Sequence, residues 1–75
     1  MRVIHEGKIY RHFKGKRYQV NTIAQHTETE ERLVIYRALY GEQKIYARPL
    51  AMFEEEVDHN KYPNISQRFR FEEIE

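Results

Sequence analysis

Apolar and polar residues alternate along the first third of the chain, and this period of two predicts β-strands. Tyr10 and His12 alternate with the other side chains of residues 8–12, and a second alternating run covers residues 17–26. Between the two runs, Gly15 lies in a lysine-rich tip and is free to adopt the positive φ of a tight turn. The pattern therefore predicts two antiparallel strands joined by a short hairpin turn.

The second of these strands is long enough to bend if it has to wrap a barrel. Its weakest point is Asn21-Thr22, which we expect to be the place of any bend. Ile23 is the one apolar residue on the otherwise polar face. The alternation predicts an inner face made of Tyr18, Val20, Thr22 and Ala24.

A wholly polar segment at residues 26–32 predicts a hairpin loop, because its threonines and glutamates favour turns and hydration. The next run, residues 33–40, is almost entirely apolar, with Arg37 as its only charge. Such a run is typical of a central strand covered on both faces. Periodicity leaves open which set faces the core: Leu33, Ile35, Arg37 and Leu39, or Val34, Tyr36, Ala38 and Tyr40.

The second half of the chain predicts two more strands and one helical turn. Residues 44–48 form a strand that Pro49 ends, since proline cannot donate to a sheet ladder. Residues 49–54 predict a turn of α- or 3₁₀-helix, and residues 68–74 a fifth strand after an irregular loop at 58–67. The helical turn is expected to plug one end of the fold with Leu50, Met52 or Phe53.

Five short strands with one helical turn before the last strand predict an all-β fold, a small five-stranded SH3-like barrel. An OB-like barrel is the rival, but it has longer strands and a fuller helix between its third and fourth strands. The 75 residues suit a single domain, residues 1–75, closed by the strand at 68–74. Val3 and Ile4 are expected to dock on the barrel edge.

Composition narrows the class of protein further. The chain has no cysteine, so disulfides and thiolate chemistry are excluded, and a reducing compartment is permitted. It contains no uninterrupted run of 18 apolar residues and no apolar stretch of signal-peptide length at its start. We therefore expect a cytoplasmic protein without a membrane segment.

Charge is unevenly distributed, although the net charge is only +1. Residues 1–50 carry ten Lys or Arg against five Glu, and residues 51–75 carry three against seven acidic residues. Residues 8–17 alone hold five basic residues and no acidic one. Two interpretations are open: the basic hairpin meets phosphates of a partner, or it is neutralised by the acidic C-terminal part of the same fold.

Spaced residues along the chain also carry a family resemblance. The segments are Tyr10-Arg11-His12-Phe13-Lys14-Gly15, Ala24-Gln25-His26-Thr27-Glu28-Thr29, Leu39-Tyr40-Gly41 and Arg48-Pro49-Leu50, with Tyr18, Val20, Val34, Tyr36, Met52 and Phe53 between them. Together they resemble the DUF1653 family of small, mostly bacterial domains, over about residues 7–57. The resemblance implies a family identity but no assigned activity, substrate or cofactor.

Histidine spacing argues against a metal site. His5, His12, His26 and His59 lie far apart, with no cysteine and no paired ligand spacing. The only serine, Ser66, lies in an irregular loop, and no glycine-rich phosphate loop is present. The sequence therefore predicts no enzyme motif, metal or cofactor.

Interleaved aromatic and basic residues give the better functional signal. On neighbouring strands such a mixture can stack bases and pair with phosphates, or line a shallow groove for a peptide. It can also be purely structural, because tyrosine favours strands and basic residues solubilise sheet edges. The candidate ligand-binding residues are Tyr10, His12, Lys14, His26, Tyr36, Tyr46 and Arg48.

Two other hypotheses come from different classes of function. In a small phosphodiester hydrolase, His12 and His26 would act as general acid and base, with Lys14 and Arg48 stabilising the anionic transition state. In a homodimer, an exposed strand edge would pair across a two-fold axis. The first interpretation remains a binding module for nucleic acid or another anionic ligand, with a protein partner as the alternative.

Overall fold

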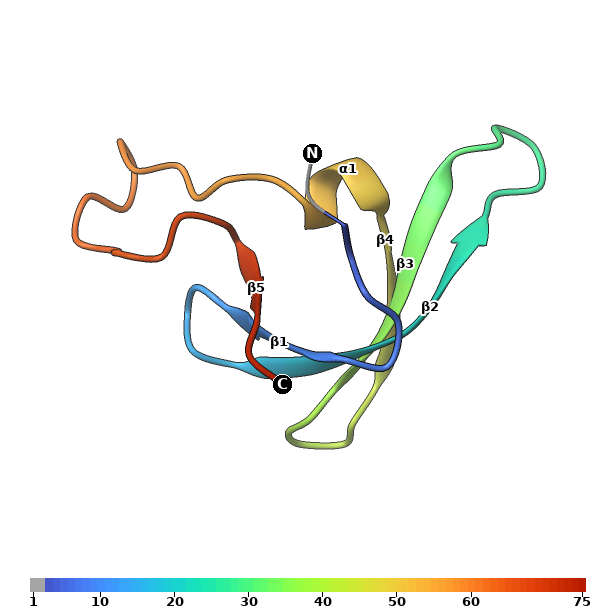
Figure 1. The fold of residues 1–75 in the computed structure, drawn as a ribbon, viewed down its shortest axis with the longest axis horizontal. Helices are drawn as coiled ribbons and strands as arrows, with labels where there is room; N and C mark the ends of the chain where they lie inside the picture. Colours follow the sequence, from blue (N-terminus) through green and yellow to red (C-terminus); the bar gives the residue numbers. More distant parts are fainter. Residues whose placement is uncertain (1–2) are drawn as a thin grey trace.

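A computed structural model describes residues 3–75 of the chain (Figure 1). It contains a five-stranded antiparallel sheet and one short helix. In chain order the elements are β1 (Ile9–His12), β2 (Arg17–Gln25), β3 (Arg32–Ala38), β4 (Ile45–Pro49), α1 (Leu50–Phe53) and β5 (Phe71–Glu73). The expected all-β class, with a short helix before the last strand, is confirmed.

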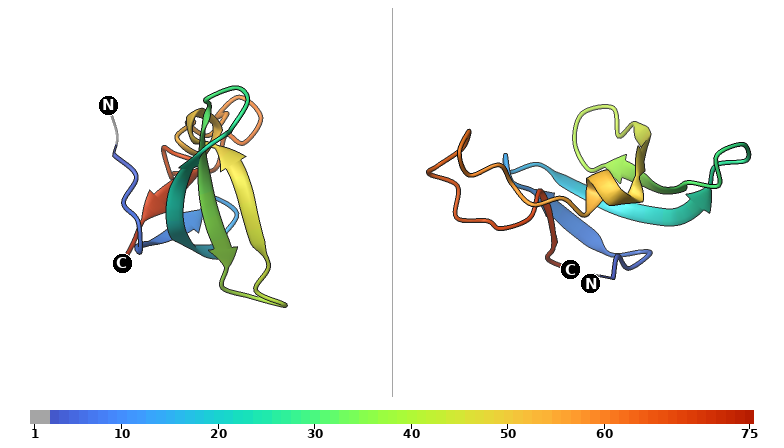
Figure 2. Two further views of the ribbon diagram at one scale, coloured as in Figure 1. Left: turned by 90° about the vertical axis from the view of Figure 1, so that its right-hand side faces the viewer. Right: turned by 90° about the horizontal axis from the view of Figure 1, so that it is seen from above.

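The sheet is strongly curled but not closed (Figure 2). Its strand order is β4-β3-β2-β1-β5, so β4 and β5 form the two edges, with no ladder between them in residues 3–75. The closed barrel expected from the sequence is therefore not confirmed. Side chains bridge the two edges instead, because the Arg48 guanidinium lies 5.4 Å from the Phe71 ring centroid.

A β-bulge bends β2 at the position that the sequence indicated. Val20 pairs with Tyr36 but Thr22 pairs with Ile35, so Asn21 has no partner in the register. One extra residue reverses the faces of the strand beyond it. Ile23 consequently packs against the core, and the prediction that Thr22 and Ala24 belong to the inner face is wrong.

The inner face of β3 is now assigned. Val34, Tyr36 and Ala38 are buried, at 0%, 5% and 2% exposure, so the second of the two sets allowed by periodicity faces the core. Cross-strand partners share a face, which places Tyr46 and Arg48 of β4 on this inner side as well, opposite Tyr36 and Val34.

Aromatic rings form the centre of the core. Phe53 of α1 stacks on Phe71 of β5 with centroids 4.1 Å apart, and Tyr10 meets Phe53 edge-on at 5.6 Å. Phe53 is fully buried whereas Met52 is 46% exposed, so Phe53 and the adjacent Leu50 make the expected plug. Ile4 is buried, as expected for an N-terminal residue that docks on the sheet, but Val3, which was expected to dock with it, is 68% exposed.

The C-terminal strand is shorter than the sequence predicted. Only Phe71–Glu73 pair with β1, while Phe69 makes a single bridge to Glu56. The loop before it is tied to β1 by Gln67, whose Nε2 donates to the carbonyl oxygens of Arg11 at 3.0 Å and Phe69 at 2.8 Å. The backbone of the first half of the predicted strand pairs with residues 55–57 instead: the N–H of Val57 donates to the carbonyl oxygen of Arg68 at 2.8 Å, and the N–H of Arg70 donates to that of Glu55 at 2.9 Å.

Candidate functional site

The aromatic core runs out to the surface at the open seam between β4 and β5. Tyr36 of β3 lies 5.4 Å from Tyr18 and 5.8 Å from Phe71, measured between ring centroids. Tyr18 and Phe71 are 5.7 Å apart, so the three rings form one cluster. These edge-to-face contacts hold the rings in fixed orientations.

Two further tyrosines form the exposed rim of this cluster. Tyr46 tilts against Tyr36 at 5.8 Å and is 41% exposed. Tyr40 is 37% exposed and its hydroxyl lies 2.6 Å from that of Tyr18. Burial and this hydrogen bond raise the pKa of Tyr18, so its phenol is neutral at physiological pH.

Basic side chains lie over the same rings. The guanidinium of Arg48 lies over Phe71, and His12 meets that ring edge-on at 4.9 Å. The ammonium of Lys16 lies 4.7 Å from the Tyr40 centroid. We call this surface the aromatic-basic face; it comprises the exposed or partly exposed residues His12, Lys16, Tyr18, Tyr40, Tyr46 and Arg48 together with the buried rings of Tyr36 and Phe71 on which they lie.

The charge of this face is not balanced within the described chain. The guanidinium of Arg48 and the ammonium of Lys16 have no carboxylate partner in residues 3–75. The acidic C-terminal part pairs elsewhere, in Glu56–Arg68 at 2.6 Å, Glu55–Arg70 at 3.9 Å and Glu75–Arg17 at 4.0 Å. Mutual neutralisation therefore applies to one part of the surface and leaves this face positive.

His12 is a neutral imidazole in this setting. Its ring stacks on Phe13 at 4.5 Å, and burial together with the nearby charges of Arg70, Arg48 and Lys14 lowers its pKa to about 4. Its Nδ1 accepts a hydrogen bond from the backbone N–H of Lys14 at 3.1 Å. This bond assigns the ring proton to Nε2.

The structure separates the seven candidate residues of the sequence into two groups. His12, Tyr36, Tyr46 and Arg48 meet on the aromatic-basic face, and Lys14 lies beside it in the β1–β2 turn. Tyr10 is only 1% exposed, and its hydroxyl donates to Glu73 Oε1 at 3.1 Å. Tyr10 therefore belongs to the core.

His26 is remote from the other candidates. Its Nδ1 accepts hydrogen bonds from the backbone N–H groups of Glu28 at 3.1 Å and Thr29 at 3.3 Å, which organises the β2–β3 hairpin loop. The nine residues of β2 separate this loop from the β1–β2 turn beside His12, a length of about 30 Å when extended. The two ends lie on opposite sides of Figure 1, so His12 and His26 do not form an acid-base pair.

Several residues of the face were missed by sequence reasoning. The sequence assigns Tyr18 and Tyr40 only to strand faces, and Phe71 only to the strand at residues 68–74. The pairing of Tyr18 with Ala38, two residues before Tyr40, brings the two phenols together. This register depends on the bulge in β2, which periodicity alone does not locate.

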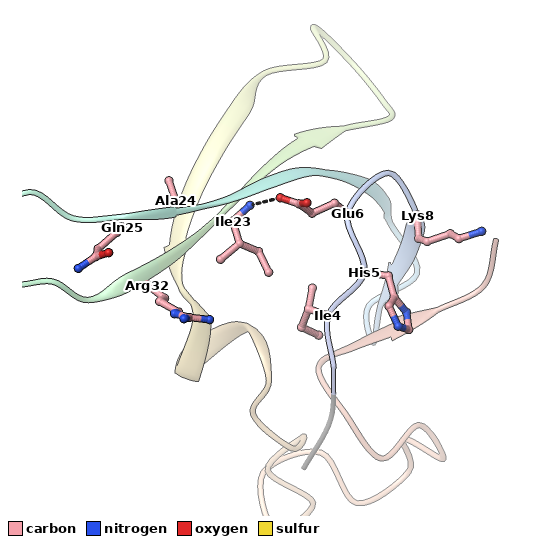
Figure 3. Close-up of a pocket in the computed structure, with 8 residues that line it drawn as sticks. All are labelled: Ile4, His5, Glu6, Lys8, Ile23, Ala24, Gln25 and Arg32. Atoms are coloured by element: carbon pink, nitrogen blue, oxygen red, sulfur yellow. Dashed lines mark hydrogen bonds between the residues drawn. The ribbon is translucent and has the colours of Figure 1, made fainter.

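A separate groove lies beneath the N-terminal segment (Figure 3). Ile4 and Ile23 face each other across it, and the carboxylate of Glu6 accepts bonds from Thr22 Oγ1 at 2.6 Å and from the backbone N–H of Ile23 at 2.8 Å. The Glu6 carboxylate is thus already hydrogen-bonded within the fold. The hydrogen bonds of Glu6 attach the N-terminal segment to β2. None of the residues that line the groove belongs to the aromatic-basic face.

Residues 3–75 contain no group of three or more His, Cys, Asp or Glu side chains placed to hold a metal ion. No helix in the same range is long and apolar enough to cross a membrane.

Together, the open sheet and the site at its seam define a class of small all-β domain built on one antiparallel sheet. The chain belongs to the DUF1653 family, a protein family of unknown function, whose model matches residues 8–73. The structure is similar to the crystal structure of a DUF1653 protein from Bordetella bronchiseptica, with a TM-score of 0.75 and 29% sequence identity over 93% of this chain and 87% of that one. No curated protein matches the chain.

Proposed function

We propose that this domain is a binding module for single-stranded nucleic acid, built on an incompletely closed SH3-like barrel. The observation that carries the proposal is the aromatic-basic face, where Arg48, which has no carboxylate partner in residues 3–75, lies over the Phe71 ring and shares one face of β4 with the partly exposed Tyr46. The strand order and the short helix before β5 support the SH3-like description.

Stacking and charge together favour this class of ligand. Unpaired bases stack on exposed aromatic rings, and each stacked base contributes about 1–3 kcal/mol. Tyr40 and Tyr46 offer rings at the rim, while Arg48 and Lys16 supply charges for the phosphates. These exposed rings and cations suit a single nucleic-acid strand, which alternates flat bases with anionic phosphates, better than they suit an apolar surface.

Cationic ligands are disfavoured by the same residues. Clusters of tyrosines can bind quaternary ammonium groups through their ring faces. Here Lys16 already lies over Tyr40 and Arg48 over Phe71, so a second cation would meet like charge. An aromatic cage for methylated lysine is therefore a poor description of this face.

An NMR titration with an unstructured, hydroxyl-ended oligothymidine tests the proposal. We expect the amide signals of residues 12–18 and 45–48 to shift at low salt, with affinity falling steeply as salt rises, because phosphate binding releases counterions. Absence of shifts at 20 mM salt, or shifts confined to the groove of Figure 3, would reject this function.

A matched pair of arginine variants adds a control. Arg48→Gln should lower the affinity at least fivefold and reduce the salt dependence by the equivalent of about one phosphate contact. Arg32→Gln removes the same charge from a strand residue on the rim of the groove and should change the affinity less than twofold. Equal losses in both variants would indicate only a general attraction to positive charge.

The free edge of β4 favours a second candidate function, association of two copies or binding of an extended peptide. Ile45 is 55% exposed on this edge strand, and an unpaired strand edge can accept another strand. Light scattering after size-exclusion chromatography distinguishes the dimer, which would have twice the mass of one chain. Ile45→Lys should abolish such a dimer and leave oligonucleotide binding intact.

A further inference from the structure

Three cations from separate parts of the chain surround His12. Lys14 lies in the β1–β2 turn, Arg48 on β4 and Arg70 directly before β5, and each acts electrostatically on the imidazole. Arg70 and Lys14 both lie 5.8 Å from the centroid of Phe13, the ring on which His12 stacks. Lys14 and Arg70 therefore lie near His12 at one end of the aromatic-basic face, whereas Lys16 lies over Tyr40.

Arg70 contributes an unused hydrogen-bond donor to this cluster. Its Nε–H is buried and has no acceptor among the described residues. The one carboxylate near its guanidinium, that of Glu55, lies 3.9 Å from Nη1, too far for a strong bond. A buried donor without an acceptor destabilises the fold, and an anion that reached it would supply the missing acceptor.

We propose that His12, Lys14, Arg48 and Arg70 form a subsite for a terminal phosphate monoester, so that the module binds the phosphorylated end of a nucleic-acid strand. This inference rests on the proposed function and specifies where on the face the strand ends. A phosphate monoester carries close to two negative charges at pH 7 and three acceptor oxygens, against one charge for a diester within the strand. Three cations with one unused donor match the terminal group better than an internal phosphate.

His12 completes the set of donors as a neutral group. Because its Nδ1 accepts the Lys14 amide, the Nε2–H is the donor that a phosphate oxygen would meet. The rings of Phe13 and Phe71 fix the imidazole from two sides, at 4.5 and 4.9 Å. The strand would then continue along Tyr46 and Tyr40, where its first bases stack.

Paired ligands test the subsite separately from the wider face. The affinity of one short oligothymidine is measured with hydroxyl ends, with a 5′-phosphate and with a 3′-phosphate, by NMR and calorimetry at pH 7.5. We expect one phosphorylated form to bind at least tenfold more tightly, with a new shift of the Arg70 Nε–H signal. Inorganic phosphate should move the same signal at millimolar concentration.

The outcomes separate the subsite from the wider binding module. If the hydroxyl-ended strand binds and both phosphates add nothing, the subsite is overturned and the binding module stands. If only a phosphorylated strand and inorganic phosphate bind, the subsite stands and recognition of the strand is overturned. If no ligand shifts any signal, both proposals are overturned.

Two variants assign the effect to Arg70. Arg70→Gln should remove the preference for the phosphorylated end and retain binding of the hydroxyl-ended strand, whereas Arg68→Gln, two residues away and paired with Glu56, should retain both. Because Arg70 also packs on Phe13, Glu55→Gln serves as a second variant that leaves the guanidinium in place. Loss of the Glu55 charge should increase the preference at least twofold, and an unchanged or smaller preference would contradict the subsite.

Discussion

His12 has an ionisable side chain, but in this fold it packs as a neutral aromatic ring. It lies between two phenylalanine rings and beside three cations, and both surroundings disfavour the imidazolium. The residue therefore acts as a neutral ring with one donor, not as a proton carrier near pH 7.

The first prediction at this scale concerns acid stability. The pKa of His12 is about 4 in the folded chain and about 6.5 when unfolded, so the unfolded state binds more protons between these values. Folding stability should therefore fall as the pH decreases from 6.5 to 4, by roughly 1–2 kcal/mol after solvent screening of the half-exposed ring. Denaturation by urea at pH 7 and pH 4.5 measures the loss.

His12→Phe keeps the ring contacts and removes the titration. Its stability should change less between pH 7 and pH 4.5 than that of the original chain, even if the lost Lys14 bond lowers both values. An equally steep loss in the variant would assign the acid sensitivity to the carboxylates alone.

Phe53 carries the second residue-scale prediction. It is fully buried and touches the rings of Tyr10, Tyr36 and Phe71. Phe53→Ala should cost about 3–5 kcal/mol, a large fraction of the stability of so small a domain. Met52→Ala, on the exposed side of the same helix, should change the stability by less than about 0.5 kcal/mol in the same urea titration.

At the scale of elements, the bulge in β2 and the N-terminal segment are fastened by one carboxylate. Glu6 accepts bonds from Thr22 and Ile23 directly after the bulge, and these bonds hold its pKa below the ordinary value. The fastening is thus complete above pH 4.5 and is lost as the pH falls through the lowered pKa.

Hydrogen exchange checks the role of Glu6. In Glu6→Ala the backbone N–H of Ile23 should exchange on the order of ten times faster, because its acceptor is gone and the segment opens locally. Glu28→Ala, in the β2–β3 loop, provides the control and should leave this amide protected. Unchanged protection of this amide in Glu6→Ala would show that the bulge is stable without the Glu6 carboxylate.

These elements also show what the pattern of residues could and could not predict. Alternation, apolar runs and turn residues together predicted the five strands, and Asn21-Thr22 was correctly identified as the place of the bend. Alternation did not predict that the bend is a bulge that brings Ile23 inward, because an inserted residue changes the phase without changing the composition. The prediction for the first half of the last strand was wrong because the backbone of residues 68–70 pairs with residues 55–57, a long-range pairing that alternation does not encode.

At the scale of the whole molecule, the main feature is the seam between the edge strands β4 and β5, which form no ladder with each other in residues 3–75. The candidate site lies where β4 and β5 approach without pairing, and its residues come from β1, β2, β3, β4 and β5. The sequence assigned His12, Tyr36, Tyr46 and Arg48 to this site and left out Tyr18 and Tyr40. It missed Arg70 and Phe71, whose contribution depends on a chain reversal that joins residues about sixty positions apart.

The last prediction concerns a chain truncated after residue 67. It loses Phe71, which is 1% exposed and contacts four rings of the core and face, and it loses the whole β5 ladder. We expect this truncated chain to lack dispersed amide signals in NMR spectra, whereas removal of residues 74–75 should preserve them. A folded truncated chain would show that β1 to β4 form an independent unit.

The pairing of β1 with β5 also sets an order of events during synthesis. Tyr10 lies opposite Glu73, so the first strand to leave the ribosome waits for the last before its outer edge is covered. Arg70 and Phe71 emerge with that last strand, and Phe71 simultaneously seals the core and supplies a ring to the face. A nascent chain is thus unable to assemble the aromatic-basic face before the last strand has paired with the first.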